Sequence, residues 1–250
     1  MVEGMPMNSN ELQRHGQFLV DRATAERFFD SEPQVLLAEA ATRGDIEGMQ
    51  EALTRGADPN AVGRHEMTPL FWAMLKQSFT AYEFLLEEGA DPNLDVYPPG
   101  GQGYGSPIEM AALMPEPDYL RAALKHGGDP NKTYGVSDFP IIYRAITHRQ
   151  LDNIKLLLRH GAEINYQDES GGTPIIEAVT ATQFEIALYL LREGADPTLS
   201  LWTGSSAVDF IKKYGNRGTD RRTNDLAAFD ELVKELKDRG LLHEDPPRFE

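Results

Sequence analysis

The feature that most constrains the fold is a five-residue motif, Gly-Ala-Asp-Pro-Asn, which returns along the chain at a nearly constant interval. It is intact at 56–60 and at 89–93, and it recurs in altered form from Gly127, Gly161 and Gly194. The leading glycines are 33, 38, 34 and 33 residues apart. Such a period is typical of a solenoid, in which each unit buries its apolar face only against its neighbours. We therefore expect a stack of repeats, which usually works through a binding surface.

Each motif follows an amphipathic helical pattern, and its residues have backbone roles. The glycine suits the left-handed position just past a helix end, where a side chain would be strained. Asp and Asn hydrogen-bond to nearby backbone and hold the turn, while proline prevents the helix from continuing. About twenty residues upstream, a Thr or Ser N-cap with a following proline predicts the start of a shorter helix. This second signal stands at Thr68-Pro69, Ser106-Pro107 and Thr173-Pro174, and one position early at Phe139-Pro140.

These two signals, recurring in phase, resemble the ankyrin repeat over about residues 34 to 240. The resemblance implies an all-α ankyrin repeat solenoid of about six helix-turn-helix units with capping helices at both ends. The expected organisation is a flexible leader over 1–9, an N-terminal capping helix over 10–33, a repeat domain over 34–243 whose last repeat is interrupted by a mobile loop at 216–225, and a loose tail over 244–250.

Two departures from the repeat pattern stand out. Five extra residues lie between Asn93 and Pro107, in a loop that contains Tyr97 and Tyr104. This loop is either a tolerated surface insertion or a recognition finger that uses its aromatic residues. In the third unit, Met114-Pro115-Glu116-Pro117 places two prolines where the tight turn between helices should be, so that turn is expected to be altered.

Composition limits the possible partners. The formal net charge is −16, which disfavours nucleic acid and bare anionic membrane and favours a basic protein partner, unless the acidity serves only solubility. The chain has no cysteine, so disulfides and thiolate chemistry are excluded. None of the six histidines has a metal-ligand spacing, and no cofactor motif is present. We therefore expect no catalytic, cofactor or metal site, and a protein that is not an enzyme.

Proteins that resemble this family usually bind other proteins on the concave side, through loop tips and the exposed ends of the first helices. Carried over to this chain, the resemblance implies partner binding by Arg64, His65, Met67, Leu75, Lys76, Tyr97, Tyr104, Leu113, Met114, Phe139, His148, Glu169, Trp202 and Tyr214. The apolar members Met67, Leu75, Leu113, Met114 and Trp202 are expected to form an exposed patch. The alternative is that some of them pack under the long loop after Asn93.

A further resemblance concerns residues 63–73, Gly-Arg-His-Glu-Met-Thr-Pro-Leu-Phe-Trp-Ala, taken with the motif at 127–131. They look like a group of bacterial ankyrin proteins that are often encoded beside secreted antibacterial effectors, notably type VI lipases. This implies an immunity protein that binds and inhibits one toxin or effector enzyme, is monomeric when free, and does not insert into a membrane. A general scaffold or host-directed adaptor is the alternative. The expected location is cytoplasmic, or periplasmic if a signal was removed or a lipase is the target.

Overall fold

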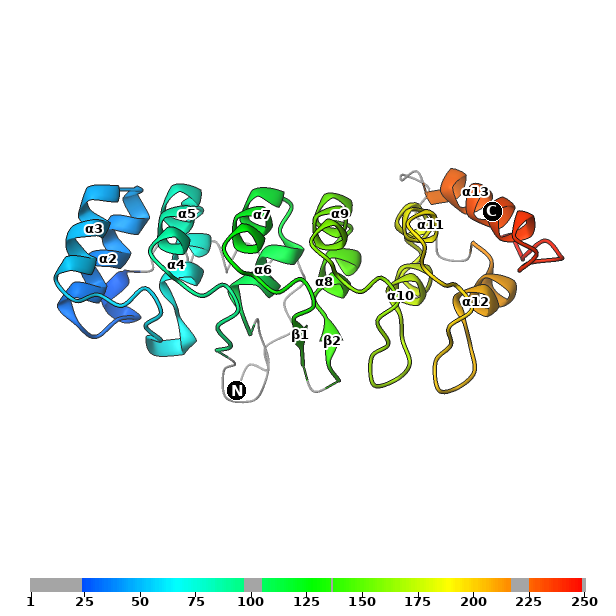
Figure 1. Cartoon of the computed structure of the whole chain (residues 1–250), viewed down its shortest axis with the longest axis horizontal. Helices are drawn as coiled ribbons and strands as arrows, with labels where there is room; N and C mark the ends of the chain where they lie inside the picture. Colours follow the sequence, from blue (N-terminus) through cyan, green and yellow to red (C-terminus); the bar gives the residue numbers. More distant parts are fainter. Residues whose placement is uncertain (1–23, 97–104, 136, 217–224, 249–250) are drawn as a thin grey trace, which may run out of the picture. The chain divides into compact units, whose positions relative to one another are not determined.

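In the computed structural model of the protein, residues 24–96, 105–135, 137–216 and 225–248 are described. They belong to two compact units, 1–107 and 108–250, which are treated separately below. Within the described residues, the α-helices follow one another in six pairs (Figure 1), and in the first five pairs a short turn joins the two helices. The predicted mostly helical repeat architecture is therefore confirmed.

The first unit contains two helix pairs and two short 3-10 turns. Its elements are η1 (Ala25–Arg27), α2 (Glu32–Arg43), α3 (Ile46–Thr54), η2 (Arg64–Glu66), α4 (Pro69–Leu75) and α5 (Phe79–Glu87). Helix α2 packs against α3 and α4, and α4 packs against α5. The largest fully buried side chain is Trp72, whose indole Nε1 donates to the carbonyl oxygen of Ala38 at 2.8 Å. This hydrogen bond joins the first helices of two successive repeats.

The second unit contains the other four helix pairs. Its elements are α6 (Pro107–Leu113), α7 (Pro117–Lys125), β1 (Thr133–Tyr134), β2 (Phe139–Pro140), α8 (Ile142–Thr147), α9 (Leu151–Arg159), α10 (Pro174–Thr180), α11 (Phe184–Arg192), α12 (Ala207–Tyr214) and α13 (Asp225–Asp238). The first helices of the repeats form an inner layer, in which α10 packs against α8 and α12, and the second helices form an outer layer, in which α11 packs against α13. Strands β1 and β2 form an antiparallel hairpin with Thr133 opposite Pro140.

The helix starts follow the predicted chemistry. The hydroxyl of Thr68 accepts a hydrogen bond from the N–H of Phe71 at 3.2 Å, and Ser206 forms a capping box with Asp209. The early proline of the fourth unit gives a different start. Pro140 pairs in the β1–β2 hairpin, and α8 begins two residues later without a side-chain cap.

The glycines of the repeated motif adopt the left-handed conformation that the sequence predicts. Gly56 and Gly161, for example, have φ of 98° and 94°. The motif asparagine, however, does more than hold its own turn. Asn131 donates from Nδ2 to the carbonyl of Gly161 at 3.0 Å, and its Oδ1 accepts from the N–H of Glu163 at 2.8 Å. Asn60 makes the same pair of bonds to the next motif of the first unit. These asparagines therefore bridge successive repeats.

The turns inside the helix pairs use one residue in the left-handed conformation. Gly44 occupies this position in the first pair, with φ of 65°. Gln77, Arg149 and Thr182 occupy it in the second, fourth and fifth pairs, with φ of 54°, 58° and 56°. In these pairs, backbone N–H groups of the turn donate to carbonyls at the end of the preceding helix, as from Thr182 to Val179 at 3.0 Å.

The third pair lacks this turn, as predicted, because Pro115 stands at the left-handed position. Proline has φ fixed near −65° and no N–H to donate. The carbonyls of Ala111 and Ala112, which correspond to the acceptors in the other pairs, receive Nδ2 of Asn153 instead, at 3.3 and 3.0 Å. The same amide nitrogen also reaches the carbonyl of Met114 at 2.8 Å. A buried side chain from α9 thus replaces the backbone donors that the prolines remove.

The N-terminal end differs from the expected capping helix. Residues 10–23 lie outside the described residues, and from Thr24 the chain forms only the short η1 before α2 begins at Glu32. Ser31 caps α2 and Phe29 is buried against the ring of Trp72. The predicted capping helix over 10–33 therefore does not reach residue 33 as a single helix, because a separate helix, α2, starts after the N-cap Ser31.

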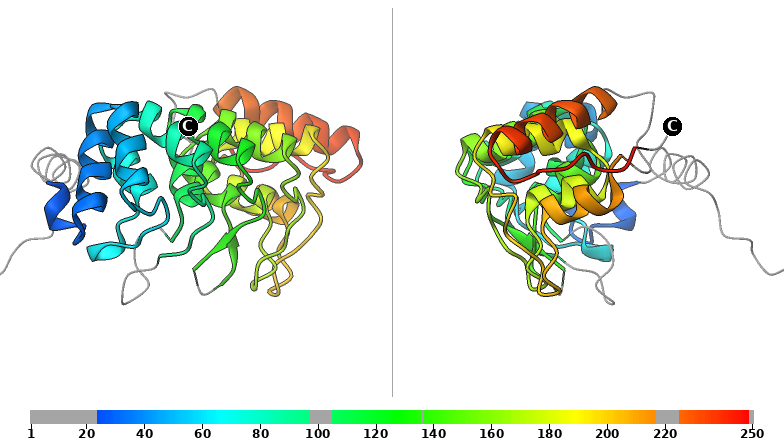
Figure 2. Two further views of the ribbon diagram at one scale, coloured as in Figure 1. Left: turned by 60° about the vertical axis from the view of Figure 1, so that its left-hand side comes forward. Right: turned by 90° about the vertical axis from the view of Figure 1, so that its right-hand side faces the viewer.

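The C-terminal end is more ordered than expected. Helix α13 buries an apolar face that contains Phe229, Leu232, Val233 and Leu236. Its first residue, Asp225, is fully buried, pairs with Arg149, and accepts from the N–H of Glu185 at 3.1 Å. In the expected loose tail over 244–250, the described residues make contacts with α13, because Asp245 pairs with Lys237 at 2.7 Å and Arg248 pairs with Asp230 at 2.8 Å; Figure 2 shows the chain running along this helix. The loop over 217–224 lies outside the described residues.

Candidate functional site

Three loops precede the inner helices α8, α10 and α12 of the second unit. We call these segments, residues 133–140, 166–172 and 199–205, the first, second and third fingers. Figure 1 shows them projecting from the same side of the unit, beyond the inner helix layer, and Figure 2 shows them side by side. They correspond to the loop tips at which the sequence predicts partner binding.

Hydrogen bonds join the first finger to the second. The hydroxyl of Tyr166 donates to the carbonyl of Asp138 at 3.1 Å, and the hydroxyl of Tyr143 donates to Oδ2 of Asp168 at 3.2 Å. Asp168 is buried, and its Oδ1 also accepts from the N–H groups of Ser170 and Gly172 at 2.7 and 2.9 Å. Burial and the nearby Asp168 raise the pKa of Tyr143 far above its ordinary value, so its hydroxyl keeps the donated proton.

The second finger is joined to the third. Nε2 of Gln167 donates to the carbonyl of Ser200 at 3.4 Å, and the N–H of Trp202 donates to the carbonyl of Ser170 at 2.9 Å. At Gly171 a Cβ atom would lie 2.8 Å from the carbonyl oxygen of Ser200, so this close approach requires glycine. The three fingers are therefore braced against one another.

Trp202 stands out on the third finger. It is 81% exposed, although indole rings are usually buried. Its Nε1 donates to the carbonyl of Glu169 on the second finger, and its own N–H is bonded to the same finger. The ring is thus held in one orientation while most of its surface stays in water. An exposed and oriented aromatic ring is the kind of group that anchors a protein interface.

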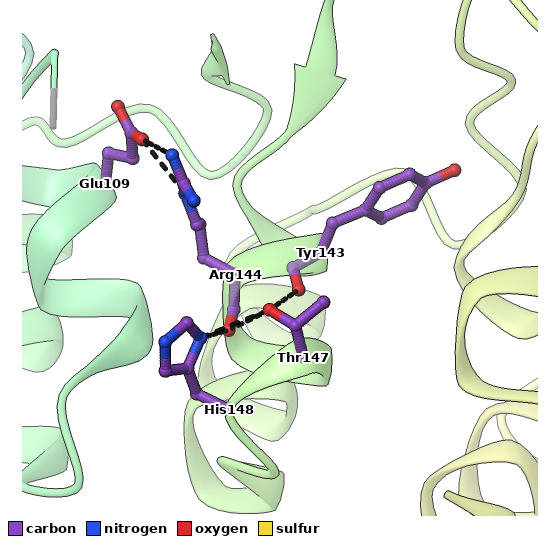
Figure 3. Close-up of polar contacts among 5 residues, drawn as sticks. All are labelled: Glu109, Tyr143, Arg144, Thr147 and His148. Atoms are coloured by element: carbon purple, nitrogen blue, oxygen red, sulfur yellow. Dashed lines mark hydrogen bonds and ion pairs between the residues drawn. The ribbon is translucent and has the colours of Figure 1, made fainter. Parts of the chain in front are cut away.

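The base of the first finger is built around Arg144 on α8 (Figure 3). Its guanidinium donates to Oε1 of Glu109 at 2.6 and 3.0 Å, and it lies 4.0 Å from the centroid of the Tyr134 ring. Glu109 is only 1% exposed, so the pair neutralises a buried carboxylate. Nδ1 of His148 lies 3.0 Å from the carbonyl of Arg144 and 3.1 Å from the hydroxyl of Thr147, which turns its ring back onto the helix.

Glu177 on α10 occupies the position one repeat after Arg144. It is half-buried, and desolvation together with the charge of Asp168 raises its pKa. By contrast, hydrogen bonds from Thr198 and Ser206 lower the pKa of Asp196 and Asp209 below the usual range. Of these three carboxylates, burial disfavours the charged form of Glu177, while hydrogen bonds favour the charged forms of Asp196 and Asp209.

The first unit has one corresponding loop, residues 63–67. Arg64 pairs with Asp30, and its N–H donates to the carbonyl of Phe28 at 2.6 Å. His65 and Glu66 both have positive φ, 57° and 56°, which is uncommon for residues with side chains. Phe28 and Asp30 thus contact one side of this loop, whose tip at His65 and Glu66 has a strained backbone.

The structure places the predicted binding residues in two separate sets. In the first unit, Arg64, His65 and Met67 lie in the 63–67 loop, and Leu75 and Lys76 lie at the end of α4. In the second unit, Leu113 and Met114 lie at the end of α6, Phe139, Glu169 and Trp202 lie on the three fingers, and His148 and Tyr214 lie at the ends of α8 and α12. Tyr97 and Tyr104 fall outside the described residues.

The predicted exposed patch is wrong for four of its five apolar members. Met67, Leu75, Leu113 and Met114 are half-buried, and only Trp202 is well exposed. Met67 lies at the end of the 63–67 loop, and the other three lie at the ends of α4 and α6. Sequence reasoning also missed the finger tyrosines 134 and 166. Their position between a turn motif and the next helix start was an available signal.

Comparison with known proteins supports the fold. A family model described as "Ankyrin repeats (many copies)" matches residues 141–191. The structure resembles the ankyrin repeat domain of Bcl-3, with a TM-score of 0.66 and 22% identity over 85% of this chain and 87% of that chain. It also resembles an ankyrin repeat domain from Acinetobacter baumannii AYE, with a TM-score of 0.63 and 23% identity over 80% of this chain and 97% of that chain. The chain therefore has the ankyrin repeat fold, and its residues 141–191 match the ankyrin repeat family.

The proteins similar to this chain in sequence include bacterial proteins. Protein PhlB of Serratia liquefaciens is 30% identical over 147 residues, which are 59% of this chain and 62% of PhlB. The putative ankyrin repeat protein YahD of Escherichia coli K12 is 28% identical over 185 residues, 70% of this chain and 88% of YahD. The chain therefore spans about three fifths of PhlB and most of YahD.

Ankyrin repeat domains mediate protein–protein interaction, which agrees with a surface built of braced loops. Among the described residues, no group of three or more His, Asp or Glu is arranged to hold a metal ion. None of the helices in those residues combines the length and the apolar composition that a bilayer crossing requires.

Proposed function

We propose that this ankyrin repeat protein binds and inhibits a single effector or toxin enzyme, as an immunity protein, through the fingers of its second unit. Trp202 carries the proposal. Burying a large aromatic ring releases much apolar surface from water, and a ring already held by Glu169 and Ser170 loses little conformational freedom on binding. A surface whose aromatic anchor is held in one orientation suits a single partner of matching shape better than many different partners.

The charge of the chain supports a basic partner. With a formal net charge of −16, the protein attracts positively charged surfaces and repels anionic ones. Complementary charge raises the association rate and excludes wrong partners more than it adds affinity. Fast association is useful to a protein that must capture a toxin before the toxin acts.

The inhibitory role rests on the resemblance of residues 63–73 to bacterial ankyrin proteins encoded beside antibacterial effectors, and the bacterial relatives are compatible with it. If the three fingers cover the partner's active site, they would keep the substrate out of that site, and the ankyrin repeat chain would need no catalytic activity. A general scaffold is the second candidate. It would bind several partners weakly and would not slow an enzyme.

The test is to purify the protein with the product of the neighbouring gene and to measure affinity by calorimetry and enzyme turnover. We expect one tight complex and loss of turnover at one equivalent of the ankyrin repeat protein. Trp202→Ala should weaken binding by about 30-fold or more, which corresponds to about 2 kcal/mol for an interface anchor. Ile46→Ala is the matched control, since Ile46 is an exposed apolar residue of α3 in the first unit.

The results separate the candidates. Binding without loss of turnover would leave only the scaffold role. An unchanged affinity for the Trp202→Ala variant would place the interface away from the fingers. In that case Met67→Asp would test the loop of the first unit.

A further inference from the structure

A second feature of the same unit, distinct from the fingers, is a cavity between α10 and α12. Its volume is about 200 Å³, and its walls are formed by Val179, Thr180, Thr182, Phe210, Tyr214 and Gly215. Binding sites for small molecules are usually larger, about 300 to 1,000 Å³. An apolar cavity of about 150 Å³ is nevertheless large enough for benzene. The cavity is therefore of the size that takes one apolar side chain.

The wall on the α10 side has an uncommon conformation. Thr182 holds φ of 56° in the turn after α10, where Gly44 stands in the first helix pair. A β-branched residue in the left-handed region is a conformational outlier, and such outliers gather at functional sites. Thr182 places a side chain on the cavity wall where glycine would leave none.

The wall on the α12 side combines aromatic surface with positive charge. Phe210 and Tyr214 stack nearly parallel, with ring centroids 6.2 Å apart, and Tyr214 is 40% exposed. The ammonium group of Lys213 lies 4.9 Å from the centroid of the Tyr214 ring. Lys213 is exposed and forms no ion pair with the described residues. In a chain with a net charge of −16, Lys213 is a local cation beside Tyr214, one of the residues that line the cavity.

We propose that the cavity between α10 and α12 binds an apolar side chain of the protein partner that stands next to a carboxylate, with Lys213 pairing with that carboxylate. This rests on the proposed protein-binding function and adds the chemistry that the partner must present. The third finger leads directly into α12, whose eight residues span about 12 Å. Trp202 and the cavity therefore lie near opposite ends of one helix, as two anchor points for the same partner.

The test uses the full chain and N-acetyl-L-leucine, which combines an apolar side chain with a carboxylate. In an NMR titration we expect saturable shifts of the methyl groups of Val179, Thr180 and Thr182, with Kd of about 1–10 mM. The matched probes are N-acetyl-L-leucinamide, which lacks the carboxylate, and N-acetylglycine, which lacks the apolar group. Each should bind at least about 5-fold more weakly, because each loses one of the two contacts.

Two variants separate the contacts within the protein. Lys213→Glu should remove the preference for N-acetyl-L-leucine over its amide, while Lys125→Glu, an equal charge change on α7, should leave it intact. Absence of saturable shifts up to about 50 mM, well above the expected Kd, would overturn the proposal. Equal shifts with all three probes would also overturn it. If the chemical shifts of the cavity methyl groups change with protein concentration when no probe is present, the cavity is occupied by a second copy of the chain, and the proposal is also overturned.

The outcome is independent of the finger interface. If Trp202→Ala weakens partner binding and Lys213→Glu does not, the cavity is not a partner site and the proposed function stands. If neither substitution changes the affinity, the proposed function fails as well. Loss of affinity with both substitutions supports the two-anchor arrangement.

Discussion

At the scale of single residues, a polar side chain can supply a hydrogen bond that the backbone of an altered repeat no longer makes. Asn153 is the clearest example. It lies on α9, fully buried, and supplies the donors that Pro115 removes from the turn after α6. A buried carbonyl without a partner costs about 1–3 kcal/mol, so this one amide decides whether the altered turn is tolerated.

Replacing Asn153 by leucine should therefore be costly. The variant keeps the size of the side chain but removes the Asn153 donor from the carbonyls of Ala112 and Met114, while the carbonyl of Ala111 keeps the N–H of Met114 at 3.3 Å. We expect a loss of about 2–3 kcal/mol in the free energy of unfolding, measured by urea denaturation. Pro115→Gly in the same background should recover part of the loss, because it restores an N–H and permits the left-handed turn. Independent, additive effects of the two substitutions would contradict this compensation.

Glu177 should make stability depend on pH. Its pKa is raised above the ordinary value of 4.5 by burial and by Asp168, so the folded state disfavours the charged form. The resulting destabilisation is absent at about pH 4 and is complete once the pH exceeds the raised pKa. Glu177→Gln should thus have a higher urea midpoint than the parent protein at pH 7, and the difference should vanish near pH 4. Glu185→Gln, on the exposed side of α11, should not reproduce this trend.

At the scale of elements, α12 and α13 depend on the segment that follows them. Residues 241–248 lie against both helices, with Leu242 buried and Arg248 paired with Asp230. The close approach is possible because Gly215, at the end of α12, has no side chain. A Cβ atom there would overlap the carbonyl oxygen of Pro247. The terminal segment is thus part of the cap that closes the outer end of the last repeat.

Gly215→Ala should displace this segment. The substitution combines a positive φ of 56° with a backbone overlap, so we expect a loss of about 2 kcal/mol or more. Hydrogen–deuterium exchange should report faster exchange in α13 and in residues 241–248. Gly194→Ala has the same kind of φ strain but meets nothing within 4 Å, and it should leave the exchange of this segment unchanged. Equal effects of both substitutions would mean that the overlap is unimportant.

At the scale of the whole molecule, the repeats of each unit form a frame, and the loops that we propose for recognition lie between successive repeats. The motif asparagines tie neighbouring repeats within each unit, as Asn60 and Asn131 do. The fingers of the second unit are tied by tyrosine, aspartate and tryptophan side chains instead. A frame held by such repeated contacts can present variable loops without losing its stability, which is the general advantage of solenoids.

The sequence by itself determined the repeat period, the helix pairs, their caps and the altered turn at Pro115. These features depend on residues close together in the chain, whose backbone preferences act locally. It also placed Trp202 correctly at a loop tip, because that position lies in phase with the helix starts.

Only the tertiary structure decided which side chains of the loops meet. The exposure of Trp202 and the partial burial of Met67 and Leu113 are features of the folded chain, and Asn153 contacts residues of another repeat. The order of residues 241–248 depends in the same way on Gly215. A contact between residues that are 30 or more positions apart is fixed by how the repeats pack, and no local pattern in the chain encodes that packing.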